Sequence, residues 1–119
     1  MRRKILLVEG ENELRQRYQV ELKASGYKVI AADSGEHALQ KLQTESVDAI
    51  VMDVVLPDGA GFDYLKKIVA SRRDVKVVIY TNHLYLKTDF NCWLADAFLA
   101  KSGDPTQLQT VLHDILEPN

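Results

Sequence analysis

The sequence predicts an α/β fold, in which a doubly wound parallel sheet of five strands is covered by five helices. Short apolar runs alternate five times with longer segments in which apolar residues recur every three or four positions. The apolar runs are nearly continuous, which is typical of strands buried on both faces. No repeat or low-complexity linker interrupts this pattern, so residues 1–119 are predicted to form a single domain.

The first part of the chain supplies two strands and two helices. Lys4–Val8 is a continuous apolar run and is predicted as the first strand. A helix follows to about Ala24, and Gly26 ends it because glycine adopts the left-handed backbone of a helix terminus without strain. Tyr27–Ala32 is the second predicted strand. Ser34 is a favourable N-cap for the second helix.

The middle of the chain contains the segment that the other elements surround. Asp48–Asp53 is predicted as a buried central strand that ends in a carboxylate. Pro57, Asp58, Gly59 and Gly61 then break the pattern, which indicates a loop before the third helix.

The third helix ends near Arg72 and Arg73, whose charges favour the negative end of a helix. Val75–Tyr80 is the fourth predicted strand. The segment Asn82–Asp96 is the least periodic, and a short fourth helix is predicted within it. Ala97–Ala100 is the fifth strand.

The last helix has the clearest start. Asp104 is an N-cap, Pro105 occupies the first helical position, and Gln107 completes a capping box.

Each predicted strand is followed by a polar residue, and a parallel sheet brings these residues to one edge. They are Glu9, Asp33, Asp53, Thr81 and Lys101. In the flavodoxin-like strand order 2-1-3-4-5 the first and third strands are neighbours at the switch point. Carboxylates can hold Mg²⁺, one carboxylate can attack phosphorus, and a hydroxyl and an ammonium can bind phosphoryl oxygens. The set predicts chemistry on a phosphoryl group.

Four motifs in their order and spacing resemble the receiver domain of two-component response regulators, over essentially the whole chain. They are Ile5–Glu9, Met52–Gly61, Tyr80–Thr81 and Asp96–Ser102. The resemblance implies a phosphorelay signalling switch rather than an enzyme, with Mg²⁺ as cofactor. It implies these roles: Asp53 as phosphoacceptor, Glu9 and the backbone carbonyl of Val55 as metal ligands, Thr81 as switch hydroxyl, Lys101 as phosphoryl-binding lysine, and Phe98 as switch aromatic.

The implied partners are a histidine kinase or histidine phosphotransfer protein and a downstream protein. The downstream protein would bind the face formed by the fourth helix, the fifth strand and the last helix. A net charge of −2 gives no global electrostatic reason to bind nucleic acid. The single cysteine and the lack of an apolar run of membrane-spanning length favour a cytoplasmic protein that does not enter the membrane.

Three departures from the family pattern qualify these expectations. Gly10 stands where receivers carry a second acid, so Mg²⁺ is expected to bind weakly; Glu9 would bind it through water, or Glu11 would take the missing place. Asn82 is larger than the residue usual after the switch threonine and is expected to cover part of the site. The segment between Thr81 and Phe98 is short, so the fourth helix is expected to be short or displaced.

Ser102 replaces the proline that usually follows the family's lysine. A cis peptide bond is predicted between Lys101 and Ser102, because that turn would aim the ammonium at Asp53. His83 is predicted as a solvent-facing loop residue; the alternative is an influence on phosphate loss.

Two further hypotheses compete with a phosphoacceptor. A degenerate receiver would bind partners without phosphorylation, and Gly10 and Asn82 favour that alternative. A flavodoxin-like enzyme is disfavoured because the sequence contains neither a Gly-rich phosphate loop nor a nucleophile–base pair.

Overall fold

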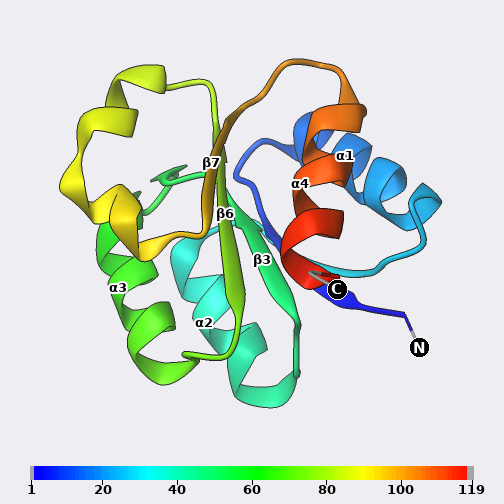
Figure 1. The fold of residues 1–119 in the computed structure, drawn as a ribbon. Helices are drawn as coiled ribbons and strands as arrows, with labels where there is room; N and C mark the ends of the chain where they lie inside the picture. The colour runs from blue at the N-terminus through cyan, green and yellow to red at the C-terminus, as the bar shows by residue number, and fades with distance from the viewer. Residues whose placement is uncertain (1, 118–119) are drawn as a thin grey trace.

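The computed structural model describes residues 2–117 and shows a parallel sheet between two layers of helices (Figure 1). The strands of this sheet are β1 (Lys4–Val8), β2 (Lys28–Ala32), β3 (Ala49–Met52), β6 (Lys76–Thr81) and β7 (Ala97–Ala100). Their order is β2-β1-β3-β6-β7, so in chain order they lie 2-1-3-4-5 and all neighbours are parallel. This confirms the predicted fold class.

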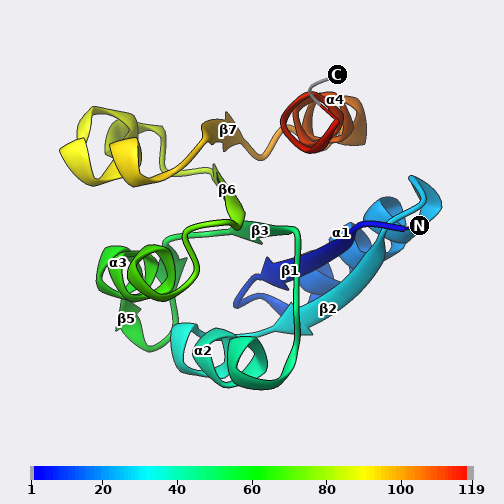
Figure 2. The ribbon, with the colours of Figure 1, turned by 60° about the horizontal axis from the view of Figure 1, so that its bottom comes forward.

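Four α-helices flank the sheet within residues 2–117. They are α1 (Asn12–Ala24), α2 (Gly35–Thr44), α3 (Gly61–Ser71) and α4 (Pro105–Leu116). Helices α2 and α3 cover one face, and α1 and α4 cover the other (Figure 2). Helices on both faces explain why the strands are apolar throughout, since neither face meets water.

The sheet divides the core into two halves because successive strand residues point to opposite faces. On the α2–α3 face the buried strand residues include Leu6, Val8, Ile50, Met52 and Ile79. On the α1–α4 face they include Ile5, Leu7, Val51, Val78 and Tyr80. Both halves contain fully buried side chains, so the central strands are anchored from each side, and their carboxyl ends are held in place.

The fourth predicted helix is short, as expected, but it is not an α-helix, so residues 2–117 contain four α-helices where five helices were predicted. Two short 3-10 helices, η1 (Leu84–Thr88) and η2 (Phe90–Leu94), replace the expected fourth α-helix. Asp89 separates them: its backbone ends η1, and its carboxylate accepts a hydrogen bond from the Asn91 amide at 2.8 Å at the start of η2. A side chain that caps a new start competes with helix continuation, and this explains the break.

The predicted helix ends are largely confirmed. Ser34 accepts a hydrogen bond from the His37 amide at 3.1 Å and caps α2. Gly26 has φ of 98° just beyond α1. Asp104 caps α4 by accepting from the Thr106 amide at 2.9 Å, one residue earlier than a capping box would place the contact.

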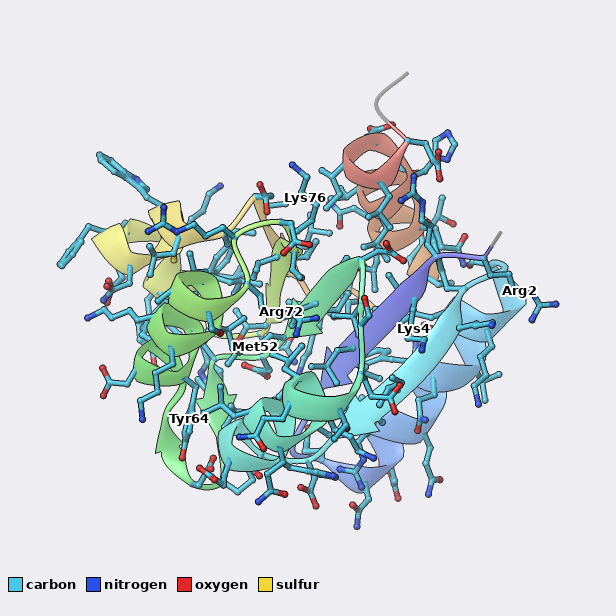
Figure 3. All side chains as sticks on the ribbon, turned by 90° about the horizontal axis from the view of Figure 1, so that it is seen from below. Arg2, Lys4, Met52, Tyr64, Arg72 and Lys76 are labelled. Atoms are coloured by element: carbon cyan, nitrogen blue, oxygen red, sulfur yellow. The ribbon has the colours of Figure 1, made fainter. Side chains whose placement is uncertain are left out.

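Arg72 has a different role from the one its position at a helix end suggests. Its guanidinium donates to the carbonyl oxygens of Leu42 at 2.8 Å and Glu45 at 3.3 Å, at the end of α2. Figure 3 shows Arg72 beneath the sheet, between the two helices of this face. Arg72 therefore ties α3 to α2 rather than closing its own helix.

The loop after β3 contains a small structure that the sequence did not predict. Strands β4 (Val55–Leu56) and β5 (Gly59–Ala60) form an antiparallel hairpin. Gly61 follows it, and a Cβ at this position would lie 1.9 Å from the backbone oxygen of Val54. Only glycine fits there, so the backbone of the hairpin and the first turn of α3 can pack directly against each other.

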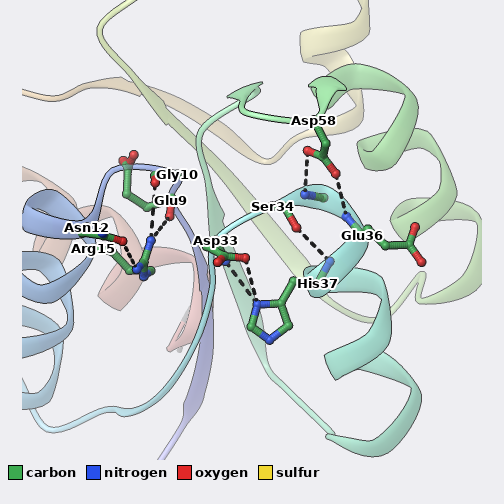
Figure 4. Close-up of polar contacts among 10 residues, drawn as sticks. Glu9, Gly10, Asn12, Arg15, Asp33, Ser34, Glu36, His37 and Asp58 are labelled. Atoms are coloured by element: carbon green, nitrogen blue, oxygen red, sulfur yellow. Dashed lines mark hydrogen bonds and ion pairs between the residues drawn. The ribbon is translucent and has the colours of Figure 1, made fainter.

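Asp58, at the turn of the hairpin, caps the neighbouring helix. Its two carboxylate oxygens accept hydrogen bonds from the amides of Gly35 and Glu36, each at 3.2 Å (Figure 4). Burial acts to raise the pKa of the Asp58 carboxyl, but the bonds from Glu36, Gly35 and the Tyr64 hydroxyl outweigh it and hold the pKa below 3.8. The loop after β3 is thereby joined to α2.

The ends of the predicted domain, Met1, Pro118 and Asn119, lie outside the described residues. Among residues 2–117, none of the helices has both the length and the apolar character needed to cross a membrane.

Candidate functional site

The register of two central strands brings two acidic residues side by side. Val8 of β1 pairs with Met52 of β3, so the next residues, Glu9 and Asp53, leave the sheet together. Both are buried, with 3% and 6% of their surfaces exposed. The Asp53 amide donates to the Val8 carbonyl at 3.0 Å, which holds the two strand ends together. As predicted for neighbouring strands, the acids share one site.

Lys101 joins the two acids. Its Nζ lies 2.5 Å from Glu9 Oε1 and 2.6 Å from Asp53 Oδ2, and no more than 7% of any of these three side chains is exposed. Burial acts to lower the pKa of the Lys101 ammonium, but its hydrogen bonds and charge attraction to Asp53 and Glu9 prevail and raise the pKa above 10.5. The ammonium is therefore charged and shared between both carboxylates.

The predicted cis bond is wrong. No cis peptide bond occurs within residues 2–117, so the Lys101–Ser102 bond is trans. The chain turns instead at Gly103, whose φ of 80° lies in the left-handed region, and the Arg17 guanidinium donates to the Gly103 carbonyl at 2.7 Å. A glycine two residues later thus provides the turn, and Lys101 reaches the acids without the strain of a cis bond.

The remaining oxygens of the two acids are held by the backbone. Asp53 Oδ1 accepts from the Val55 amide at 2.9 Å, and Glu9 Oε2 accepts from the Glu11 amide at 3.1 Å. Each acid therefore has one oxygen on the ammonium and one on an N–H group. Such contacts fix the carboxylate orientation before any ligand binds.

Thr81 and Phe98 lie around this cluster at different depths. Thr81 ends β6 and is fully buried; its Oγ1 accepts from the His83 amide at 3.2 Å, and its carbonyl accepts from the Lys101 amide at 3.1 Å. Phe98 is half-buried and packs against the α2–α3 half of the core, together with Leu86 and Cys92. Thr81 is thus joined to Lys101 through the backbone, whereas Phe98 packs against the α2–α3 half of the core.

An open cavity of about 450 Å³ lies above Asp53. The residues that line it are Glu9, Gly10, Glu11, Asp53, Val55, Leu56, Pro57, Asn82, His83 and Lys101. Asn82 is exposed and also lines the cavity. His83 is half-buried and stacks edge-on with Tyr85, with 5.9 Å between ring centroids. His83 is thus a partly exposed loop residue, and it also lines the open cavity.

The oxygen atoms that line the cavity are of the type that binds a hard cation, but few of them are available. Glu9 and Asp53 offer carboxylates and Val55 a carbonyl, which are the oxygen ligands that Mg²⁺ prefers. The Glu11 side chain is exposed. Within residues 2–117 no group of three or more His, Cys, Asp or Glu side chains is placed to hold a metal ion. The residues fit a divalent cation, with fewer carboxylates than a tight site requires.

Gly10 leaves the second acidic position empty, and a neighbouring ring borders it. A Cβ on Gly10 would lie 2.7 Å from Pro57 Cδ and 2.9 Å from Pro57 Cγ. Arg15 lies on the other side of the loop and donates to the carbonyls of Glu9 at 3.0 Å and Gly10 at 3.5 Å (Figure 4). The loop is thus packed against the Pro57 ring, and its carbonyl groups are held by the Arg15 guanidinium.

The sequence placed Pro57 and Asp58 in the loop after the central strand without indicating their contacts, and it did not indicate Arg15. Arg15 and Asp58 act through backbone groups, which carry no residue signature. Pro57 acts through its shape, since its ring borders the space beside Gly10. A loop proline and a helix arginine are each common, so neither residue type singles out this role.

The family model described as the response regulator receiver domain matches residues 5–113. The alkaline phosphatase synthesis transcriptional regulatory protein PhoP of Bacillus subtilis is 44% identical over 68 residues, which is 57% of this chain and 28% of PhoP. The probable transcriptional regulator ycf27 of Cyanidium caldarium is 30% identical over 94% of this chain and 45% of its own length. The chain thus spans less than half the length of these relatives.

The solved structures that resemble this fold include the response regulator protein TrrA of Thermotoga maritima in complex with Mg²⁺-BeF. It has a TM-score of 0.92 and 28% identity, covering 98% of this chain and 100% of that one. TrrA bound to the histidine kinase ThkA matches with a TM-score of 0.89 and 28% identity, covering 98% of this chain and 99% of that one.

Proposed function

The chain belongs to the response regulator receiver domain family, and we propose that it accepts a phosphoryl group on Asp53 within a two-component phosphorelay. The observation that carries this proposal is the buried Asp53 carboxylate, which is bridged to the Lys101 ammonium at 2.6 Å and borders an open cavity. A buried nucleophile with a fixed cation beside it suits transfer of an anionic group.

The transfer step uses groups already in place. An Asp53 oxygen attacks phosphorus while the phosphorus–nitrogen bond to the donor's imidazole breaks and its electron pair returns to the nitrogen. Lys101 then pairs with a phosphoryl oxygen, and the Thr81 hydroxyl turns to donate to another. Since Lys101 also contacts Glu9 at 2.5 Å, a new bond to the phosphoryl group changes both acid contacts together.

A divalent cation bound at this site would screen the negative charges of the acids and the phosphoryl group. We propose that Glu9, Asp53 and the Val55 carbonyl hold Mg²⁺ weakly, with Glu11 as a further ligand if its side chain turns inward. The solved TrrA complex carries Mg²⁺ and a beryllium fluoride group, which supports this cofactor. Gly10 and the Lys101 bridge support weak binding, because they lower the negative charge that remains free.

The proposed donor is a histidine kinase or a histidine phosphotransfer protein. The complex of TrrA with ThkA supports this class of partner. We propose that the downstream protein binds the face formed by the η1–η2 segment, β7 and α4, because Phe98 packs there and β7 leads directly to Lys101. The chain would act in the cytoplasm as one receiver domain, residues 1–119, and as a switch rather than an enzyme.

A degenerate receiver is the second candidate function. Two features favour it. The Lys101 ammonium bridges Glu9 and Asp53 and so already neutralises part of their charge, which a divalent cation would otherwise do. Gly10 provides no carboxylate at the second acidic position, which lowers the affinity for such a cation. Such a protein would bind its partner in a single state without phosphorylation.

Intact-mass measurement after treatment with acetyl phosphate and Mg²⁺ decides between the two candidates. Wild type is expected to gain one phosphoryl mass, Asp53→Ala none, and Asp58→Ala the same as wild type. Asp58 is the matched control, since it lies in the same loop but its carboxylate accepts hydrogen bonds from the Gly35 and Glu36 amides and from Tyr64, not from the residues around Asp53. No label on a folded wild type would favour the degenerate receiver, and equal labelling of Asp53→Ala would refute Asp53 as acceptor.

A further inference from the structure

The η1–η2 segment concentrates exposed apolar side chains. Five of the seven large hydrophobic residues that are exposed in the described chain lie within residues 84–94. They are Leu84, Tyr85, Phe90, Trp93 and Leu94, with exposed fractions of 54, 72, 74, 89 and 36%. The three aromatic rings alone leave roughly 350–600 Å² in water, at about 150–250 Å² per ring. Large apolar surfaces left in water by a folded protein often mark interaction sites.

Part of this surface is concave. Phe90, Trp93 and Leu94 of η2, with Asn91, line a groove of about 410 Å³ against Lys66 of α3, which we term the aromatic groove. Figures 1 and 2 show η1 and η2 as yellow coils beside α3, on the side of the molecule away from α1 and α4. The groove shares no lining residue with the cavity above Asp53.

Lys66 is the only charged residue that lines the aromatic groove. Its exposed ammonium lies beside apolar rings, so the groove combines an apolar floor with one positive charge at its rim. A ligand that fits must bring apolar side chains and one carboxylate. The groove volume of about 410 Å³ suits a few side chains rather than a whole domain face.

A second copy of this chain fits the groove poorly. A two-fold contact between identical patches would bring the two Lys66 ammonium groups toward each other. The groove lining contains no acidic residue to separate them. Like charges held together across an interface oppose association, so charge favours a different partner.

We propose that the aromatic groove binds an amphipathic helix of a partner protein through its apolar side chains, with an acidic residue of that helix paired to Lys66. Anchors at i, i+3 or i+4 and i+7 would enter the groove, as in other helix-in-groove contacts. The exposed rings of Phe90 and Trp93 provide the apolar contact, and Lys66 sets the charge preference. This inference does not depend on phosphorylation of Asp53.

Trp93 reports on this binding directly, because it is the only tryptophan in the chain and lies in the groove. The probes are two synthetic helical peptides of equal length with the same Leu and Phe face, one flanked by Glu and one by Lys. They are titrated into unphosphorylated wild type, Lys66→Glu and Phe90→Ala. The readouts are the Trp93 emission maximum and its quenching by acrylamide. Lys66 and Phe90 are exposed, so both variants are expected to fold with the wild-type melting temperature.

The acidic peptide is expected to shift Trp93 emission to shorter wavelength and to halve its quenching at saturation. The basic peptide should bind wild type at least tenfold more weakly. Lys66→Glu should reverse this order, and Phe90→Ala should weaken both peptides. Equal binding of the two peptides, an unchanged order in Lys66→Glu, or no response to either would overturn the proposal. So would a blue shift on concentrating the protein alone, which would identify a second copy as the occupant.

Discussion

At the scale of single residues, the central feature is one ammonium between two buried carboxylates. Lys101 contacts Glu9 at 2.5 Å and Asp53 at 2.6 Å. Breaking a buried ion pair by removing one partner is strongly destabilising, because the charge that remains is buried without compensation. Here removal of the lysine would leave two such charges, so the three side chains that form the proposed site also stabilise the fold.

Lys101→Met is expected to lower the free energy of unfolding by about 3–5 kcal/mol at neutral pH. Urea unfolding followed by circular dichroism measures this difference. Glu9→Gln in the Lys101→Met background should restore part of the loss, because it removes one uncompensated charge. A Lys101→Met protein as stable as wild type would show that the acids reach water or protonate without cost.

The same contact predicts a pH dependence. The pKa of Lys101 is raised on folding above its ordinary 10.5, so its contribution is fully present below about pH 10.5. It is lost as the pH rises through the higher folded pKa. The stability difference between wild type and Lys101→Met should thus be constant from pH 7 to 10 and shrink above that range. A difference that shrank between pH 7 and 9 would contradict this assignment.

Gly10→Asp is expected to tighten Mg²⁺ binding. One more charge about 4 Å from the ion is worth roughly 1–4 kcal/mol, so the affinity is expected to rise about fivefold or more. The new Cβ would meet the Pro57 ring at 2.7 Å, so the gain should be larger in the Pro57→Ala background. Isothermal titration calorimetry of the two single variants and the double variant measures both effects. Unchanged affinity in the double variant would mean that Glu11 already fills the position.

Sequence alone predicted the members of this site better than their contacts. Glu9, Asp53, Thr81 and Lys101 follow strands, and the strand order alone brings them to one edge. The cis bond at Lys101 was wrong because the turn depends on Gly103, whose backbone angle no side chain reveals. The contacts of His83 could not be predicted, because they involve the Thr81 hydroxyl and the Tyr85 ring, which lie close only in the folded chain.

At the scale of elements, the loop after β3 is held by backbone packing. Gly61 brings the first turn of α3 against Val54, and Asp58 caps α2. Strong apolar periodicity allowed α1, α2, α3 and α4 to be predicted, with end residues such as Ser34 and Asp104. The η1–η2 segment could not be predicted in detail, because its aromatic residues are exposed rather than arranged in a core stripe.

Gly61→Ala is expected to destabilise the fold by about 1–3 kcal/mol and to slow labelling of Asp53, because the methyl group must push the Val54 backbone away. Gly26→Ala is the control: Gly26 has φ of 98° with open space around it. It should cost about 1–2 kcal/mol through backbone strain alone and leave labelling unchanged. Urea unfolding and intact mass after acetyl phosphate give the two readouts. Equal labelling rates of both variants would refute a coupling between Gly61 and the site.

At the scale of the whole molecule, the central strands of the sheet and residues 82–96 differ in local stability. The central strands are buried on both faces, whereas residues 82–96 contain two short 3-10 helices with exposed side chains. Regions with few buried apolar contacts open at lower free energy than the core. Residues 82–96 are therefore expected to unfold locally more readily than the central strands, within one fold.

Hydrogen–deuterium exchange is expected to show this difference. Amides in residues 82–96 should exchange at least a hundredfold faster than those of β1 and β3 in the free protein. Mg²⁺ with beryllium fluoride should slow exchange in residues 82–101 of wild type and leave Asp53→Ala unchanged. Uniform protection across the sheet and residues 82–96 would contradict the local difference.

The two segments on either side of the Asp53 cavity differ in how firmly they are held: the β4–β5 hairpin is one, and the chain from Thr81 into η1 is the other. The hairpin packs against α3 at Gly61 and is hydrogen-bonded to α2 through Asp58, so it resists displacement. The other segment runs from Thr81 into the two short 3-10 helices, which are held less firmly. A change in the contacts of Glu9 and Asp53 is therefore expected to move residues 82–96 more readily than the hairpin. Binding of a ligand at Asp53 would thus displace Thr81, Phe98 and the exposed aromatic side chains, while α2 and α3 keep their positions.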